Sequence, residues 1–240
     1  MNGTPTLLLV HGAWHSPWCW DKFTPELDRR RIAWSAVSLP CVGDDPKTLG
    51  GVEDDISTIE NAARAIKGEV VVLAHSYAGV PVTGAQHPSN VSHLIYLGAF
   101  MPDAGQSLVD LLPPGPLPPF VIDNGDGTTS VKPELAIPTF YADCDPSTAW
   151  WSASKLRLHN GVCNVTPVRR AAWREIPSTY ILLTEDYACP TTVQRTVHKQ
   201  ARTTIELEGS HSPFLAKPAV LANTVASILS SGERRRASAA

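Results

Sequence analysis

Short apolar runs alternate with polar, helix-like stretches along most of the chain. Runs rich in leucine and β-branched residues predict six strands, at 6–10, 32–37, 70–74, 93–98, 179–184 and 203–207. Several are apolar at every position, which is typical of a parallel sheet covered on both faces. Residues 52–66 show helical spacing of apolar side chains, closed by Gly68. The pattern predicts an α/β fold with a mostly parallel central sheet and helices on both faces.

One region interrupts this rhythm. Residues 102–167 contain a cluster of prolines, the turn-like stretch 123–127 and a helical stretch with Trp150 and Trp151, but no obvious strand of the main sheet. We interpret the region as an insertion that folds over one edge of the sheet as a cap or lid. A disordered linker between two domains is the alternative, although neither flank alone looks like a complete domain.

Length and composition fit this division. A chain of 240 residues that is 43% hydrophobic and 18% charged can bury one full core. We therefore expect an α/β core from residues 1–101 and 168–231, a cap from 102–167 and a flexible tail at 232–240. A helix is expected over 217–229.

Charge and targeting signals point to no macromolecular partner. The formal net charge of -3 provides no basic field for nucleic acid, and the charge run at 233–236 is interpreted as part of a frayed tail. No stretch reaches membrane-spanning length and no signal peptide is evident, so the expected location is cytoplasmic, without nucleic-acid or membrane binding. The sequence is compatible with a homodimer.

Five cysteines are scattered along the chain without CxxC spacing. Free thiols fit this distribution better than disulfides or zinc. They are Cys19, Cys41, Cys144, Cys163 and Cys189.

The strand near residue 70 ends at an isolated serine between small residues. The sequence Ala74-His75-Ser76-Tyr77-Ala78 has the small-x-Ser-x-small pattern of a nucleophile elbow, a strained turn between a strand and a helix. Alanine replaces both usual glycines, and a serine that merely caps a helix is the alternative interpretation. Ser76 is therefore a candidate nucleophile whose assignment depends on partners elsewhere.

A serine nucleophile needs a base and an orienting acid. His211 lies on the loop after the last predicted strand and is the candidate base. The predicted strand at 179–184 ends in two carboxylates, of which we prefer Asp186 to Glu185 as the acid. Asp103 is a more distant alternative. The order Ser, Asp, His matches the α/β-hydrolase version of the triad.

The oxyanion needs backbone donors from the loop after an early strand. The stretch His11-Gly12-Ala13-Trp14 follows the first predicted strand, and Gly12 permits a sharp turn there. We assign the two donors to the backbone amides of Ala13 and Tyr77.

These motifs resemble those of the α/β-hydrolase superfamily along nearly the whole chain. In particular the chain resembles the group of small plant methyl esterases, hydroxynitrile lyases and bacterial esterases. The resemblance is carried by residues 11–14, 74–79, 184–186 with Pro190, and 209–214, and residues 140–146 resemble the cap of bacterial relatives. It implies that Ser76, Asp186 and His211 form the catalytic triad.

The same resemblance separates two chemistries. The related hydroxynitrile lyases carry a threonine at the second position of the oxyanion loop and a lysine directly after the catalytic histidine. Those positions are Gly12 and Ser212 here. Ester hydrolysis is therefore favoured over cyanohydrin cleavage.

We accordingly expect a serine esterase that cleaves a small-molecule carboxylic ester or lactone through an acyl-enzyme, without metal or organic cofactor. Aromatic side chains from the cap and the oxyanion loop are candidates for the substrate pocket. The preferred ones are Trp14, Phe100, Trp150 and Trp151, with Trp18, Trp20 and Phe120 as further candidates. Two alternatives stay open: a receptor-like ligand-binding protein on the same scaffold, and cofactor-free oxygenase or lyase chemistry.

Overall fold

The core of the protein is a six-stranded parallel sheet. The computed structural model describes residues 4–237, and the strand order in this sheet is β10-β9-β5-β4-β1-β2. Its strands are β1 (Thr6–Val10), β2 (Trp34–Val37), β4 (Val70–His75), β5 (Val91–Leu97), β9 (Ser178–Leu183) and β10 (Thr203–Leu207). All six strands predicted from the apolar runs are present, and the predicted fold class is confirmed.

The register of the sheet explains why these runs are apolar throughout. In the central pairing Leu8 lies opposite Val72, and β4 continues the pairing with β5 through Leu73 and Ile95. Every residue of β4 and β9 is buried. Both faces of the central strands must therefore be apolar, because helices cover each of them.

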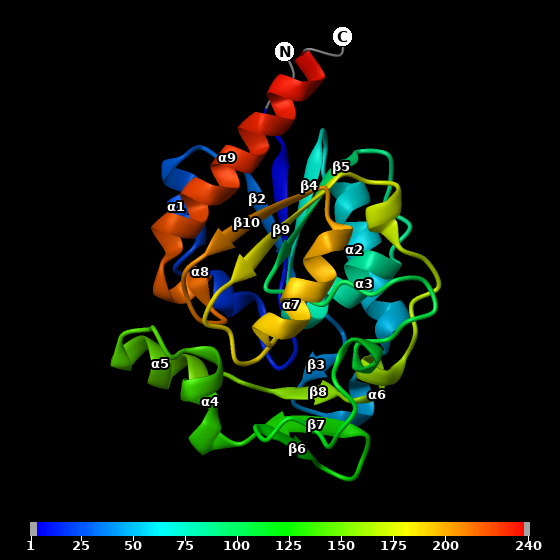
Figure 1. Cartoon of the computed structure of the whole chain (residues 1–240), viewed down its shortest axis with the longest axis vertical. Helices are drawn as coiled ribbons and strands as arrows, with labels where there is room; N and C mark the ends of the chain where they lie inside the picture. The colour runs from blue at the N-terminus through cyan, green and yellow to red at the C-terminus, as the bar shows by residue number, and fades with distance from the viewer. Residues whose placement is uncertain (1–3, 238–240) are drawn as a thin grey trace.

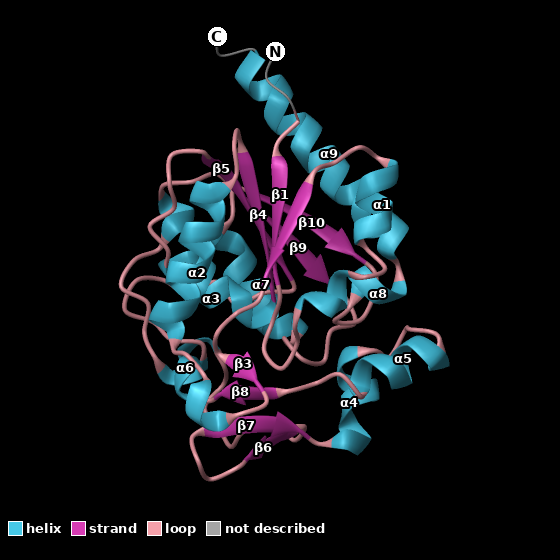
Figure 2. Ribbon diagram, turned by 180° about the vertical axis from the view of Figure 1, so that it is seen from behind, coloured by secondary structure: helices cyan, strands magenta, loops and turns pink. Residues whose placement is uncertain are grey.

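Helices lie on both sides of the sheet. α1 (Thr24–Arg29) and α9 (Pro218–Ala237) pack together on one side, whereas α2 (Val52–Ala65) and α3 (Gly79–Gly84) pack together on the other (Figures 1 and 2). The remaining helices are α4 (Pro133–Phe140), α5 (Pro146–Ala153), α6 (Val162–Val165), α7 (Thr191–Val197) and α8 (Pro213–Ala216). Short 3₁₀ turns span Pro17–Trp20, Pro46–Thr48, Ser76–Ala78 (η3), Val109–Leu111, Ala172–Arg174 and His198–Gln200.

Residues 102–167 contribute three strands to a second, antiparallel sheet, which the apolar pattern did not predict, and the fourth strand comes from earlier in the chain. Its order is β3-β8-β7-β6, and its strands are β3 (Val42–Gly43), β6 (Val121–Asp123), β7 (Thr128–Val131) and β8 (Leu158–Asn160). These strands are short and contain threonine, serine, histidine and asparagine, so no apolar run marks them. This sheet, with α4 and α5, lies beyond the carboxyl ends of the main strands (Figures 1 and 2).

The last helix is longer than its sequence pattern indicated. α9 extends to Ala237 instead of ending at residue 229, since the alanine and arginine residues after the apolar stripe have high helix propensity. The helix therefore passes through much of the predicted tail, and residues 238–240 lie outside the described part of the chain.

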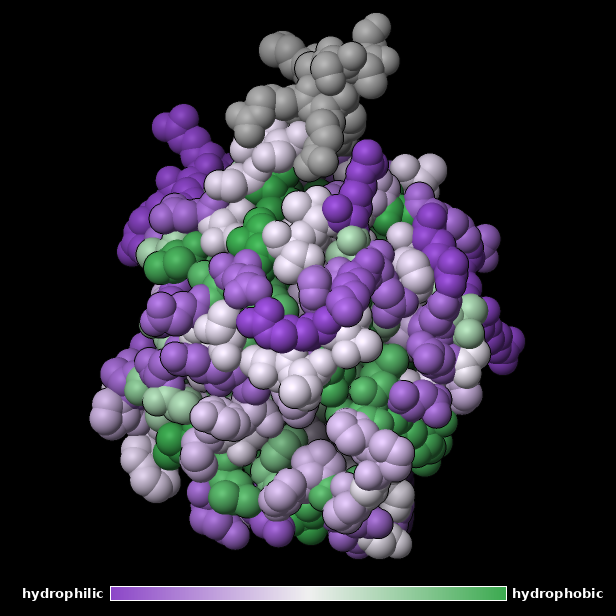
Figure 3. Space-filling model, viewed as in Figure 1, coloured by the Kyte–Doolittle hydropathy of each residue, from purple (hydrophilic) through white to green (hydrophobic). Residues whose placement is uncertain are grey.

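The surface mixes polar and apolar side chains. On the face of Figure 3, apolar residues form several separate patches between polar ones. Most of the large apolar side chains that are exposed belong to residues 102–167, among them Leu117, Trp150 and Val165. Among the described residues, none of the helices combines the length and the apolar character needed to cross a membrane.

Close backbone packing after β4 generates the first prediction. A Cβ atom at Gly79 would lie 1.8 Å from the carbonyl oxygen of Phe100. We expect Gly79→Ala to lower the free energy of unfolding by about 3 kcal/mol or more, because a backbone atom has to move. Gly115→Ala is the matched control, since its Cβ would meet no atom within 4 Å. Urea denaturation measures both, and equal stabilities would contradict the expectation.

Candidate active site

Ser76 lies on the turn between β4 and α3. Its φ of 56° is in the left-handed region, which is strained for a residue with a Cβ atom. The Ser76 carbonyl accepts a hydrogen bond from the Phe100 backbone N–H at 3.1 Å, while the residue itself is partly exposed. The buried neighbours Ala74 and Ala78 are small enough for this close packing. The turn thus has the geometry of a nucleophile elbow, with alanines in the places of the usual glycines.

The structure joins His211 to Asp186. Nδ1 of His211 lies 2.8 Å from Oδ2 of Asp186, and both side chains are almost completely buried. A carboxylate can only accept a hydrogen bond, so the proton of the neutral imidazole resides on Nδ1. Nε2 of His211 is therefore left with a lone pair that can accept a proton.

Asp186 is held by four donors. Oδ1 accepts hydrogen bonds from the backbone N–H groups of Ala188 and Cys189 at 2.8 and 2.9 Å, and Oδ2 accepts from Nε2 of Gln194 at 2.9 Å as well as from His211. Together these bonds fix the position of both carboxylate oxygens in a buried site. Gln194, which no sequence pattern marked, thereby fixes the carboxylate that orients the imidazole.

The two alternative acids lie elsewhere. Glu185 is exposed. Asp103 is engaged with Arg174, whose Nε lies 3.0 Å from Oδ1 of Asp103. Neither carboxylate is the hydrogen-bond partner of His211, so geometry favours Asp186.

His75, directly before Ser76, connects the turn of Ser76 with the loop that carries His211. Its Nε2–H donates to the carbonyl oxygen of His211 at 2.9 Å, and the two rings lie 4.4 Å apart. Burial lowers the pKa of His75 well below its usual range, and this keeps the ring neutral. His75 therefore fixes the main chain of His211 beside the turn of Ser76. Its position next to the serine was the only sequence signal for this role.

The loop after β1 lies against Ser76. A Cβ atom at Gly12 would be 2.8 Å from Cβ of Ser76, so a larger residue would not fit there. Nδ1–H of His15 donates to the Ala13 carbonyl oxygen at 2.8 Å, which fixes that peptide group. Tyr77 lies in the first turn after β4, where backbone N–H groups have no intrahelical acceptor. The two amides assigned as oxyanion donors thus come from loops in contact with each other.

An aromatic cluster extends from this loop to the histidine. The ring of Phe140, at the end of α4, lies 5.6 Å from the His211 ring, 5.7 Å from the His15 ring and 5.9 Å from the Trp14 ring. Trp14 and Phe100, two of the predicted pocket residues, are buried. Phe140 belonged to the stretch that resembles a bacterial cap, but was not among the predicted pocket residues.

The other two predicted pocket residues lie further out on α5. Trp150 is 69% exposed and Trp151 is 40% exposed. The Trp151 ring packs edge-on against Trp18 at 5.2 Å. Their assignment to the substrate pocket stays a prediction.

A second contact ties residues 102–167 to the histidine loop. Asp143 accepts hydrogen bonds from both the backbone N–H and the hydroxyl of Ser210, the residue before His211. Together with Phe140, this contact places the insertion directly against the candidate base. A separate group of two cysteines and a histidine could hold a metal ion, and it includes none of Ser76, Asp186 and His211.

Comparisons with known proteins agree with this geometry. Residues 7–224 match the family described as the alpha/beta hydrolase family. The alpha/beta hydrolase nvfD of Aspergillus novofumigatus is 28% identical over 89% of this chain and 92% of its own length. Methylesterase 4 of Arabidopsis thaliana is 30% identical over 42% of each chain.

A solved structure shows the same fold. A pyrethroid hydrolase from Sphingobium faniae superposes with a TM-score of 0.80 at 22% identity, covering 94% of this chain and 97% of its own. The predicted resemblance to the superfamily and to its methyl esterase-like members is confirmed.

Buried neutral histidines generate a pH-dependent prediction. Burial lowers the pKa of His15 to about 3. In the unfolded chain His15 takes up a proton near pH 6.5, whereas in the folded chain it stays neutral at that pH. The contribution of neutral His15 to the free energy of unfolding is therefore complete above pH 6.5 and is lost as the pH falls toward 3. Between pH 7 and 5 we expect wild type to lose about 2 kcal/mol more than His15→Asn. Denaturant titrations at both pH values test this, and parallel losses would contradict it.

Proposed function

The chain belongs to the alpha/beta hydrolase family, and from this premise we propose that it is a serine esterase for small carboxylic esters or lactones. The observation that carries the proposal is the buried hydrogen bond between His211 and Asp186, anchored through His75 to the turn of Ser76. Relatives of this chain include esterases and hydrolases. The residues needed for acyl transfer follow the carboxyl ends of β4, β9 and β10 in the same parallel sheet.

In the proposed mechanism, Nε2 of His211 removes the proton of the Ser76 hydroxyl as its oxygen attacks the ester carbonyl. Asp186 stabilises the imidazolium that forms, because its carboxylate accepts the Nδ1–H. The backbone amides of Ala13 and Tyr77 stabilise the oxyanion. His211 then protonates the departing alcohol and an acyl-enzyme remains.

Hydrolysis of the acyl-enzyme repeats the same steps with water. His211 takes a proton from the attacking water molecule, and collapse of the second tetrahedral intermediate returns the proton to Ser76. No step requires a metal or an organic cofactor.

We propose that residues 102–167 act as the cap of this site and that Phe140 forms part of its acyl pocket. Phe140 lies between Trp14 and His211. Buried aromatic side chains around the base favour an apolar or aromatic acyl group. A lyase role is disfavoured because Gly12 and Ser212 replace the threonine and lysine that the resembling lyases carry.

Replacing the nucleophile tests the proposal directly. We expect Ser76→Ala to lower kcat/KM for short- and medium-chain p-nitrophenyl esters by at least ~10³-fold, on the scale of losing a triad member. Ser178→Ala is the control, because this buried serine lies at the amino end of β9, opposite the site. Equal rates for wild type and Ser76→Ala would refute a role of Ser76 as nucleophile.

The orienting acid has a separate test. Asp186→Asn should lower kcat by about 10³–10⁴-fold, since the amide no longer stabilises the imidazolium or the required tautomer. The substrate KM should change little, because Asp186 is buried behind His211. An Asp186→Asn variant that keeps more than a tenth of the wild-type kcat would contradict this role.

An active-site phosphonate distinguishes the remaining alternatives. A serine esterase should be labelled once per chain at Ser76, and Ser76→Ala should not react. Poor labelling of wild type would favour the receptor-like alternative. Oxygen uptake with a heteroaromatic substrate that persists in Ser76→Ala would favour the cofactor-free oxygenase.

A further inference from the structure

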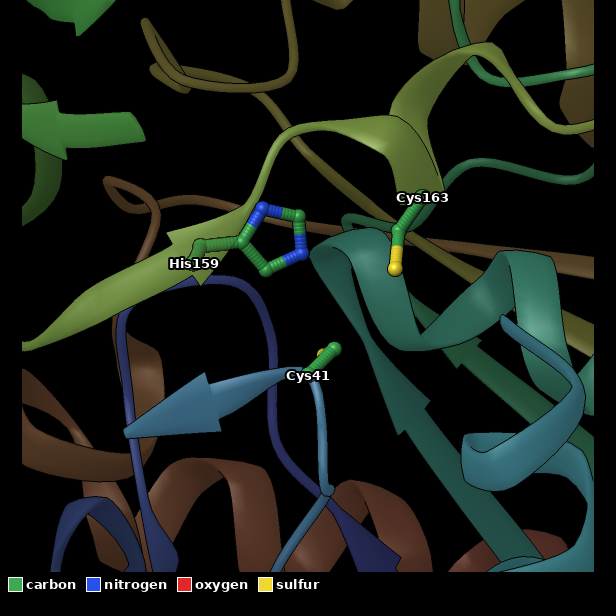
Figure 4. A group of neighbouring side chains, drawn as sticks. All are labelled: Cys41, His159 and Cys163. Carbon is green, nitrogen blue, oxygen red and sulfur yellow. The ribbon is translucent and has the colours of Figure 1, made fainter. Parts of the chain in front are cut away.

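Three buried side chains that the proposed esterase mechanism does not use converge behind the active site. The thiols of Cys41 and Cys163 and a ring nitrogen of His159 lie within 4.8 Å of one another, and all three residues are buried. Cys41 directly precedes β3, His159 lies in β8 and Cys163 lies in α6. Figure 4 shows the His159 ring and the Cys163 sulfur directed toward the space between the three residues.

Within the described part of the chain, neither ring nitrogen of His159 has a hydrogen-bond partner. His159 is completely buried, so neither ring nitrogen is in contact with bulk water. Buried polar groups are rarely left without partners, because each unpaired group destabilises the fold. The unpaired imidazole therefore indicates that a ligand completes the site.

We propose that Cys41, His159 and Cys163 bind one Zn²⁺ ion. Thiolate sulfur and imidazole nitrogen are the ligands that zinc prefers, and a tetrahedral ion requires these atoms to lie about 3.5–4 Å apart. The three ligand atoms, which lie within 4.8 Å of one another, have to approach only slightly for an ion to bind. Both thiols lose a proton on binding, so the ion and its two thiolates form a neutral unit in the buried site.

Three protein ligands leave one coordination position for water or a small exogenous ligand. A metal-bound histidine usually donates its other ring N–H to a hydrogen-bond acceptor, and on His159 this second nitrogen stays available for such a bond. Binding one ion therefore accounts for the two thiols and one of the two unpaired nitrogens.

The ion would fasten residues 102–167 to the core. Val42 and His159 are paired across β3 and β8, and the Asn160 N–H donates to the Cys41 carbonyl oxygen at 2.9 Å. The ligands thus come from both sides of this junction, where a shared ion restrains their relative movement. This inference does not depend on the esterase proposal.

The site also contacts Tyr77, whose backbone amide is one of the proposed oxyanion donors. The ring of Tyr77 lies 4.7 Å from that of His159, and the Tyr77 hydroxyl donates to Asp55, which also accepts from the Cys41 N–H. Loss of the ion would therefore be transmitted to Tyr77 through direct contacts.

Little in the sequence indicated this site. His159 and Cys163 are four residues apart, but Cys41 is distant in the sequence and no CxxC pair is present, so free thiols without metal were expected. Pairing of β3 with β8 brings the three ligands together.

Metal binding by the full chain tests the inference. Protein purified under reducing conditions and stripped with a chelator should take up one Zn²⁺ per chain in competition with a chromophoric chelator. Co²⁺ should give thiolate-to-cobalt charge-transfer absorption in the near ultraviolet. Thermal unfolding of the same wild-type protein should shift upward with added Zn²⁺.

Single substitutions then identify the ligands. Cys41→Ser, Cys163→Ser and His159→Gln should each weaken Zn²⁺ binding by at least ~100-fold, since loss of a second-sphere group alone costs 10–100-fold. Cys19→Ser is the matched control, because Cys19 is equally buried but lies outside the cluster. It should bind Zn²⁺ like wild type.

Three results would overturn the inference. The first is the absence of thiolate-to-cobalt absorption in wild type, a measurement that requires no variant to fold. The second is equal loss of Zn²⁺ binding in Cys19→Ser and Cys41→Ser. The third is a disulfide between Cys41 and Cys163 in protein purified without reductant, with no Zn²⁺ bound after its reduction.

Discussion

The close approach of backbones around Ser76 is the constraint on which the rest of the candidate active site depends. Ser76 adopts a left-handed conformation, Gly12 has no room for a Cβ atom against it, and Gly79 has none against Phe100. A turn packed this tightly admits only small neighbours, and strain of this kind persists only when the surroundings fix it. The result is a partly exposed hydroxyl at a position fixed relative to the end of β4.

Buried polar groups then fix the remaining parts of the site relative to that turn. His75 holds the main chain of His211, Asp186 holds its imidazole, and Gln194 holds Asp186. In a buried site each of these groups would be costly without its partner, so the network specifies a single arrangement. The same burial keeps His75 neutral, which leaves its Nε2–H as a donor to the His211 carbonyl.

Residues 102–167 are attached to this network at separate points. Phe140 contacts His211, and Asp143 accepts hydrogen bonds from Ser210. A third connection runs through β3 and β8, where His159 contacts Tyr77. The insertion is thus joined to both loops of the proposed catalytic machinery, and a change in its packing would reach the base as well as the oxyanion donors.

The sequence by itself determined the fold class, because strands buried on both faces must be apolar throughout, and that pattern can be recognised without a structure. It also singled out Ser76, His211 and the adjacent carboxylates Glu185 and Asp186, since each follows a recognisable strand and the carboxyl ends of parallel strands meet at one edge of the sheet. Only the tertiary structure distinguished Asp186 from Glu185, because the choice depends on which neighbouring carboxylate faces the imidazole. It alone revealed the second sheet, whose short polar strands become recognisable through pairing. The tertiary structure alone also revealed the cluster around His159, because folding of the chain brings together side chains that local sequence patterns cannot relate.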